Sequence, residues 1–202
     1  MLQAHTFDPV FDKNSRVLVL GTLPSVKSRE NGFYYGHPRN RFWRVISAVL
    51  SRPVPESIGE KRELLLGGGI ALWDVVRRCD ITASADSSIR DAEPNDIGLM
   101  LSSCRIKNIF ANGQTAARLY DRLLRPSCGR DIIALPSTSP ANASWSEARL
   151  IDALQSILEK AARRAENAEL LLSARHSEGA KRPKNPPDGS AGVTTAYCSA
   201  PQ

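Results

Sequence analysis

Long apolar runs are missing from this chain of 202 residues, and none of its segments approaches the length needed to cross a bilayer. Its first twelve residues, MLQAHTFDPVFD, also lack the basic start and the apolar centre of a secretory signal. We therefore expect a soluble, cytoplasmic protein that does not bind a membrane.

Cysteine is scarce, and its spacing does not match that of common metal sites. The four cysteines form no CxxC pair and have no histidine at ligand spacing. This pattern matches neither zinc nor iron–sulfur motifs and favours buried free thiols over a metal site. We predict that the protein binds no metal and needs no cofactor. The cysteines are Cys79, Cys104, Cys128 and Cys198.

A strong overall charge is also lacking. The net charge is +6, and it divides evenly along the chain. Residues 1–159 carry 20 basic and 17 acidic side chains, and residues 160–202 carry 7 and 4, so each part has a net charge of +3. The total is weak evidence for a polyanion partner, and a local cluster is more informative.

Basic and aromatic residues gather in one stretch, from Gly21 to Trp43. Five of the twelve aromatic residues lie within residues 33–43, and residues 27–44 carry five basic side chains against one acidic, a net of +4. Cations suit phosphates and flat rings suit bases, so this composition indicates a nucleic-acid contact. The stretch lies between a buried apolar run and an amphipathic segment, which predicts a loop joining a first strand to a first helix.

Short apolar runs alternate with helical patterns along the rest of the chain. The apolar runs predict buried strands at residues 16–20, 70–73 (running into Asp74), 106–111 and 132–135. The helical patterns predict helices from Arg41 to before Pro53, over 95–103, after Asn112-Gly113, and from a Ser144-x-x-Glu147 capping box onward. The remaining segments at 1–15 and 80–93 are interpreted as an irregular lead-in and an exposed loop.

This order of elements predicts an α/β fold, a three-layer sandwich with a central parallel, mainly four-stranded sheet flanked by helices. We expect a domain over residues 1–160, a helix extension over 161–173 and a disordered basic tail over 174–202, which is polar and aperiodic. Ligands bind outside the carboxyl ends of the strands in such sheets. Four segments at those ends should form one crevice, namely Gly21–Asn40, Asp74, Asn112-Gly113 and Pro136–Asn142.

Several strings in that crevice resemble the uracil-DNA glycosylase superfamily, most closely its hypoxanthine-DNA (deoxyinosine) glycosylase branch, over about residues 15–160. The strings are GTLPS (21–25), FYYGHPRNRFW (33–43), GGIALWDVV (68–76), FANGQTAARLY (110–120) and LPSTSPANAS (135–144). The resemblance implies a monomeric, monofunctional base-excision repair glycosylase that acts on DNA containing deaminated bases, with hypoxanthine favoured. The alternatives are a uracil or broad-specificity glycosylase, or a non-catalytic nucleic-acid or nucleotide-binding module.

Asn40 is the residue to which the resemblance assigns catalysis. Other branches place an Asp or Asn inside the first motif, but Gly-Thr-Leu-Pro at 21–24 has neither. The Asn carbonyl can hold and polarise a water that attacks the sugar once the glycosidic bond has largely broken. The competing interpretation is that Asn40 caps the following helix. His37 can stabilise the departing base or a phosphate, or form a loop hydrogen bond.

The base-binding residues are expected from the first two strand ends and the aromatic string. Asp74 aligns with the Asn that reads the base edge in uracil-excising relatives, and its carboxylate can accept the N1–H of hypoxanthine. Asp74 can equally cap a turn or pair with Arg77 or Arg78. Tyr34 or Tyr35 is expected to stack on the flipped base, whereas Phe42 and Trp43 should pack in the core. The base-binding set is Tyr34, Tyr35, Asp74, Gly21 and Thr22.

DNA contacts are expected from basic and hydroxyl side chains around the crevice. The loop after the fourth strand can bring hydroxyl and N–H groups to phosphates, and Asn142 or Ala143 can enter the duplex behind the flipped base. A plain strand-to-helix turn is the alternative. The predicted DNA-binding residues are Ser25, Arg39, Arg41, Ser137, Thr138, Ser139, Pro140 and Asn142.

Overall fold

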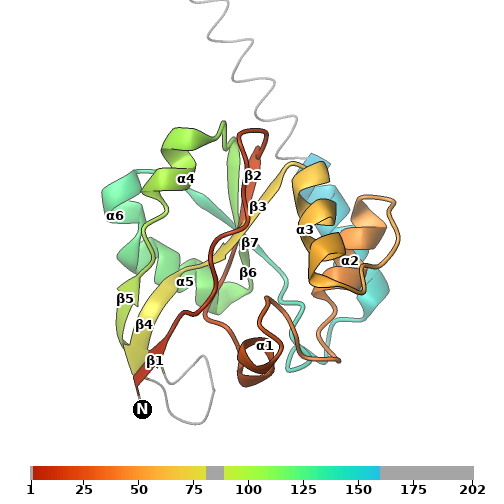
Figure 1. The fold of residues 1–202 in the computed structure, drawn as a ribbon, viewed down its shortest axis with the longest axis horizontal. Helices are drawn as coiled ribbons and strands as arrows, with labels where there is room; N and C mark the ends of the chain where they lie inside the picture. Colours follow the sequence, from red (N-terminus) through yellow and green to blue (C-terminus); the bar gives the residue numbers. More distant parts are fainter. Residues whose placement is uncertain (1, 81–88, 160–202) are drawn as a thin grey trace, which may run out of the picture. The chain divides into compact units, whose positions relative to one another are not determined.

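The computed structural model describes residues 2–80 and 89–159, and Figure 1 shows a central sheet between two groups of helices. Its four strands are parallel and lie in the order β3-β2-β6-β7. The α/β fold class expected from the sequence is therefore confirmed. The strands are β2 (Val17–Gly21), β3 (Ile70–Asp74), β6 (Asn108–Asn112) and β7 (Ile132–Leu135).

Helices cover both faces of this sheet because its strands are apolar on both sides. Along β2, Val19 packs into one core cluster while Leu18 and Leu20 pack into the other. The first face is covered by α2 (Phe42–Val49), α3 (Ile58–Gly67) and a helix over 147–159. The second is covered by α4 (Gly98–Ser103), α5 (Gln114–Leu123) and α6 (Arg125–Cys128).

A second, antiparallel sheet was not expected. It contains β1 (Leu2–Ala4), β4 (Val76–Asp80) and β5 (Arg90–Pro94), in the order β1-β4-β5. The interpretation of residues 1–15 as irregular was therefore wrong for β1, and the exposed loop proposed for 80–93 contains β5. These strands are short and polar, so their sequences lack the apolar runs that marked the parallel strands.

Two further elements depart from the sequence-based prediction. The connection from β2 to α2 is not a single loop, because it contains α1 (Val26–Glu30), capped by Ser25. Helix α3 was not predicted, although Ser57 and Glu60 form a capping box at its start.

The helix over 147–159 begins later than the predicted capping box implies. Its cap is Ser146, whose hydroxyl accepts the Arg149 N–H at 3.3 Å, while Glu147 instead forms an ion pair with Arg44. The predicted helix extension at 161–173 and tail at 174–202 lie outside the described residues, as does Cys198.

The described cysteines behave as thiols of the protein interior. Cys79 and Cys104 are buried, as predicted, and burial raises the pKa of the Cys104 thiol. Cys128 is only partly buried, with its sulfur 3.1 Å from the Tyr120 hydroxyl. Within residues 2–80 and 89–159, no helix is long and apolar enough to cross a membrane.

Candidate active site

The site begins where β2 and β3 end side by side. Gly21 and Asp74 are the last register partners of these two parallel strands. The Val75 N–H then donates to the Gly21 carbonyl at 2.9 Å, and the Val76 N–H donates to that of Thr22 at 3.0 Å. Pairing thus continues past the strands and fixes the two chain segments from which the base-binding residues were predicted.

Gly21 leaves room for the Asp74 carboxylate. A Cβ at position 21 would lie 2.1 Å from Asp74 Oδ1 and 3.0 Å from the Tyr35 hydroxyl, far closer than real carbon contacts. Asp74 is also buried, with 4% of its surface exposed. The first strand end, the aromatic string and Asp74 therefore meet at one point, as the crevice prediction required.

The two tyrosines of the aromatic string have different environments. Tyr34 is 2% exposed, and its hydroxyl donates to the Asp8 carbonyl at 2.9 Å, so burial raises the pKa of this phenol well above its usual value. Tyr35 is only partly buried, has a φ of 53°, and stacks on Phe42 with ring centroids 3.9 Å apart. Tyr34 is a core residue, and Tyr35 is the ring beside Asp74.

Asn40 lies just before α2 and supports that helix. Its Oδ1 accepts the Phe42 N–H at 3.0 Å, although the N-cap position itself is occupied by Arg41. The same Oδ1 accepts the Thr138 hydroxyl at 3.0 Å. Both lone pairs of the oxygen are thus occupied, while Nδ2 has no acceptor among the described residues. Asn40 is thus not the N-cap that the sequence interpretation considered, although its contact with the Phe42 N–H does support the start of α2.

A directed hydrogen-bond chain fixes the Asn40 amide. Asn112, at the end of β6, donates from Nδ2 to Thr138 Oγ1 at 2.9 Å, and its Oδ1 accepts the Thr138 N–H at 3.0 Å. Because Thr138 Oγ1 accepts from Asn112, its own proton is available for Asn40. Thr138 is 2% exposed, so this chain lies in the protein interior. Three strand-end segments therefore determine where the Asn40 side chain sits.

Arg41 organises the loop that follows β7. Its guanidinium donates to the carbonyls of Ser139 at 2.7 Å and Asn142 at 3.1 Å, and also to those of Thr138 and Trp145. Asn142 Nδ2 in turn donates to the Ser137 carbonyl at 2.8 Å. Arg41 was expected to bind phosphates, but its guanidinium instead donates hydrogen bonds to backbone carbonyl oxygens. Pro140 lies in this loop and is partly buried.

The remaining predicted residues line the outer part of the site. Arg39 is exposed, and no described residue forms a hydrogen bond or ion pair with its guanidinium. His37 Nδ1 accepts the Arg39 N–H at 3.1 Å, which is the loop hydrogen bond considered for it. Ser25 is exposed at the start of α1, where its hydroxyl accepts the Ser28 N–H.

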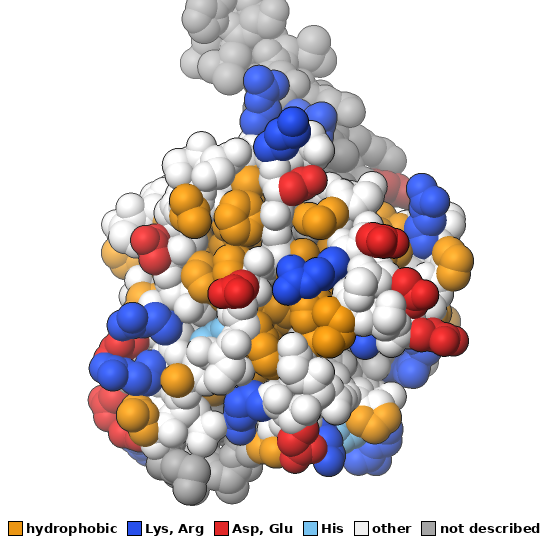
Figure 2. Space-filling view, viewed as in Figure 1, with side chains coloured by type: hydrophobic (Ala, Val, Ile, Leu, Met, Phe, Trp, Pro, Cys, Tyr) orange, Lys and Arg blue, Asp and Glu red, His pale blue; other side chains and the backbone are white. Residues whose placement is uncertain are grey.

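Basic side chains do not form one continuous patch on the face in Figure 2. Lys and Arg side chains are interspersed there with Asp and Glu side chains. This distribution agrees with the small net charge of the chain.

Sequence reasoning missed His5. Its Nε2 lies 2.8 Å from Asp74 Oδ2, and the two side chains are 3% and 5% exposed. No local pattern could have revealed this contact, because it joins positions 69 residues apart. The neighbouring strand β1 is only three residues long. Asp74 pairs with His5, whereas Arg77 and Arg78 both bind Glu93.

The geometry defines an α/β protein in which polar side chains of several segments meet at the carboxyl edge of a parallel sheet. Residues 9–162 match the family described as the Uracil DNA glycosylase superfamily. The chain belongs to that superfamily, in agreement with the resemblance seen in its motifs.

The alignments with individual relatives cover most of the length of each relative. A Methanosarcina acetivorans protein named Hypoxanthine DNA glycosylase is 37% identical over 145 residues, which are 71% of this chain and 90% of that protein. A Methanosarcina barkeri protein of the same name is 32% identical over 152 residues, 70% of this chain and 95% of that protein. A solution NMR structure from M. acetivorans, titled as a candidate uracil DNA glycosylase, is 31% identical, covers 77% of this chain and 98% of its own, and has a TM-score of 0.65.

Proposed function

We propose that this protein is a monofunctional DNA glycosylase that removes a deaminated base, hypoxanthine above all, from DNA. The single observation that carries the choice of base is the buried Asp74 carboxylate beside Gly21 and Tyr35. The names of the two Methanosarcina relatives support the same substrate. The enzyme is proposed to act as a cytoplasmic monomer.

Base recognition follows from the chemistry of a carboxylate. Hypoxanthine presents an N1–H donor beside its O6 acceptor, and a carboxylate oxygen accepts from that N–H. Adenine presents a lone pair at N1 and is repelled, which costs about 1–3 kcal/mol in a buried site. Gly21 leaves the space in which this oxygen lies. Tyr35, which is partly buried beside it, is the ring proposed to stack on the everted base and contribute about 1–3 kcal/mol.

Bond cleavage places positive charge on the sugar and negative charge on the departing base. Stabilising these charges is the main task of such a site. His37 lies in the loop before Asn40, where its Nε2 is proposed to donate to the departing base or to a phosphate, because Nδ1 already accepts the Arg39 N–H. Water then attacks a sugar that is already cationic, so a strong base is not needed.

Asn40 is proposed to hold that water, although through a different atom than expected. We expected its carbonyl oxygen to bind the water, but Oδ1 already accepts from Phe42 and Thr138. The remaining group is the Nδ2 amine. A water that accepts one hydrogen bond from Nδ2 keeps a second lone pair for the sugar carbon. The Thr138 contact orients the amide for this purpose.

Contacts to the duplex are assigned to the outer residues. Arg39 is proposed to bind a phosphate because no described residue neutralises it. Ser25 and the loop containing Ser137, Ser139 and Pro140 are proposed to line the DNA path, with Asn142 and the exposed Ala143 at the tip. Thr138 and Arg41 support this loop from within.

Strand cleavage is not expected, since that reaction needs an amine nucleophile. Lys27 is the amine of the motif stretch, and it forms an exposed ion pair with Glu30 at 2.7 Å. Nucleophilic lysines instead lie in desolvated or cationic surroundings. The product should therefore be an intact strand with an abasic site.

Release of bases from defined duplexes tests the function. Duplexes containing deoxyinosine, deoxyuridine or deoxyxanthosine are incubated with the protein and then treated with alkali. Inosine strands should break after alkali and not before it, and Asn40→Ala should abolish release while DNA binding remains. Preferential release of uracil would favour the uracil-directed alternative. Binding without release of any base would favour the non-catalytic module.

A further inference from the structure

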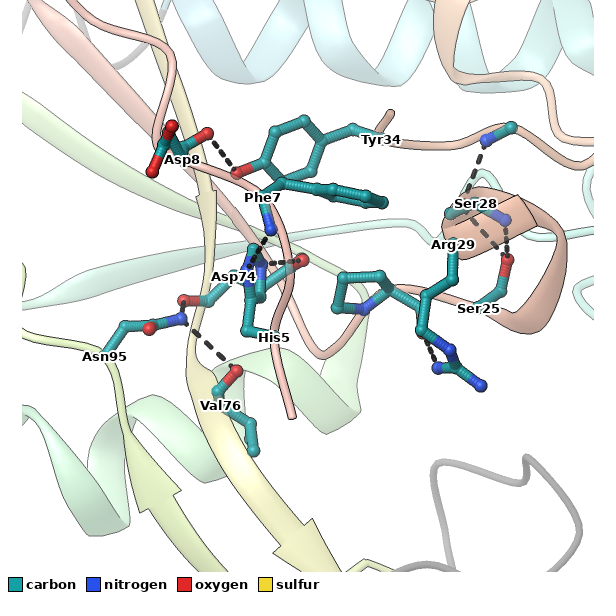
Figure 3. Close-up of polar contacts among 12 residues, drawn as sticks. His5, Phe7, Asp8, Ser25, Ser28, Arg29, Tyr34, Asp74, Val76 and Asn95 are labelled. Carbon is teal, nitrogen blue, oxygen red and sulfur yellow. Dashed lines mark hydrogen bonds and ion pairs between the residues drawn. The ribbon is translucent and has the colours of Figure 1, made fainter. Parts of the chain in front are cut away.

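We propose that His5 is a positioning residue that holds the Asp74 carboxylate in the orientation needed to select hypoxanthine. The inference rests on the proposed function, and it adds a specificity determinant from a segment outside the recognised motifs. Figure 3 shows His5 and Asp74 in contact, with Asn95 on the other side of the Asp74 backbone.

Hydrogen bonding determines which nitrogen of His5 carries the proton. The Phe7 N–H donates to Nδ1 at 3.2 Å, so Nδ1 must present a lone pair. The proton of the neutral ring is then on Nε2, which lies 2.8 Å from Asp74 Oδ2. His5 therefore donates to Asp74 Oδ2, which acts as the acceptor.

The two oxygens of Asp74 have separate surroundings. Oδ2 accepts from His5, whereas Oδ1 lies over Gly21 on the side of the Tyr35 hydroxyl. The backbone is fixed as well, because Asn95 Nδ2 donates to the Asp74 carbonyl at 2.9 Å and to that of Val76 at 3.2 Å. One oxygen is thus used to anchor the side chain, and the other is directed to the proposed base site.

The segment that carries His5 is itself tied to the domain. The His5 N–H donates to the Arg77 carbonyl at 2.7 Å, and Val10 and Leu72 exchange backbone hydrogen bonds of 2.9 and 2.8 Å. Between them, the Asp8 carbonyl accepts the Tyr34 hydroxyl. The backbone is therefore fixed at His5 and at residues that follow it, so the imidazole has a defined position, as a positioning group must have.

Loss of the His5 donor should change base selection and not only the rate. A carboxylate free to rotate would no longer direct Oδ1 at the N1–H of hypoxanthine, and it would no longer repel the N1 lone pair of adenine. Both changes weaken the preference for hypoxanthine over adenine.

The test compares two variants of similar size, His5→Leu, which lacks a donor, and His5→Gln, which keeps an N–H near the position of Nε2. Binding is measured with duplexes containing 2′-fluoro-deoxyinosine or 2′-fluoro-deoxyadenosine, each opposite an abasic spacer so that base pairing does not differ. Release of hypoxanthine is measured in parallel. Leu2→Ala is the control, because Leu2 lies on the same segment with 61% of its surface exposed.

We expect His5→Leu to lose about 10- to 100-fold of the binding preference for hypoxanthine, the range for a lost hydrogen bond to a charged group. His5→Gln and Leu2→Ala should stay within about threefold of the parent. A general loss of folded protein would lower binding of both duplexes equally and leave their ratio unchanged. An unchanged ratio in folded His5→Leu overturns the proposal.

Two further readouts keep the inference separate from the proposed function. The binding preference does not require cleavage, so a parent protein that prefers hypoxanthine without releasing it would contradict the function and leave the His5 role standing. Nitrogen NMR of the parent histidines gives a test that needs no variant. Protonated Nε2 and unprotonated Nδ1 in His5 support the proposal, and the opposite tautomer overturns it.

Discussion

The Thr138 hydroxyl donates to Asn40 Oδ1 over 3.0 Å, although 98 residues separate the two in sequence. Asn40 lies just before α2, and Thr138 lies in the loop that follows β7. Because Thr138 is in turn fixed by Asn112, the orientation of the proposed catalytic amide depends on the side chains of both residues.

Thr138→Val should therefore slow base release while leaving the fold intact. The change preserves shape but removes the donor to Asn40 and the acceptor for Asn112. We expect a loss of about 1–3 kcal/mol in the free energy of unfolding and a single-turnover rate about tenfold lower. Thr138→Ser keeps the hydroxyl and should retain most of the rate. Equal rates for Val and Ser would show that the contact does not orient Asn40.

Gly21→Ala should abolish base release by displacing Asp74. The added Cβ would lie 2.1 Å from Oδ1, so the carboxylate or the strand end must move. A displacement of about 1 Å can cost about 100-fold in rate. Gly67→Ala is the matched control, because nothing lies within 4 Å of its Cβ. Single-turnover rates and melting curves of the two variants provide the measurement, and near-parental release by Gly21→Ala would contradict the proposed base site.

Asp74→Asn should shift the relative rates on inosine and uracil duplexes. An amide adds a donor beside the acceptor, which matches the Asn that reads the base edge in uracil-excising relatives. Since a buried polar mismatch is worth about 1–3 kcal/mol, the ratio should move about 5- to 100-fold toward uracil. Competition between the two duplexes in one reaction measures this ratio directly. A constant ratio would remove Asp74 from base recognition.

Arg39→Gln should weaken DNA binding without regard to the base. One phosphate contact fewer predicts a slope of log K against log salt that is smaller by about 1. Affinities for inosine and undamaged duplexes, titrated across salt concentrations, give this slope. Loss confined to the inosine duplex would instead indicate a role at the flipped base.

Arg41→Gln should act on stability instead. Its guanidinium binds backbone carbonyls of the loop after β7, including those of Ser139 and Asn142. Hydrogen bonds to a charged group contribute about 1.5–3 kcal/mol, so the variant should unfold more easily by about 2–3 kcal/mol. Chemical denaturation measures the change. If Arg41→Gln unfolds like the parent but has a smaller slope of log K for DNA binding against log salt, Arg41 binds phosphate instead.

The parallel sheet and most of its helices could be predicted because their signals are local. Each strand of that sheet is a short apolar run, and α2 and α5 have apolar residues at helical spacing. Strand β4 has only two buried residues among five, and β5 has none, so their sequences look like loop. Helix α3 does have a local signal, the capping pair Ser57 and Glu60, and the sequence-based prediction missed it.

The site was predictable to the extent that motifs encode it. The motif strings alone assign Asn40, Asp74 and Tyr35 to one crevice. They do not distinguish the buried Tyr34 from the partly buried Tyr35, because adjacent tyrosines have the same chemistry and differ here in burial. Nor can they reveal the contact of His5 with Asp74 or the hydrogen bonds from Arg41 to the loop after β7, because both depend on tertiary packing between distant segments.

The register between β2 and β3 bears on how base preference can change among proteins of this fold. Since Gly21 and Asp74 are paired at the last position of the two strands, a change of the side chain at position 74 alters the proposed base site while the strand framework stays as it is. A one-residue slip of β3 along β2 would turn Asp74 to the other face of the sheet, away from Gly21. Base preference in this fold can therefore change by substitution at position 74, whereas an insertion within β2 or β3 would disrupt the pairing of Gly21 with Asp74.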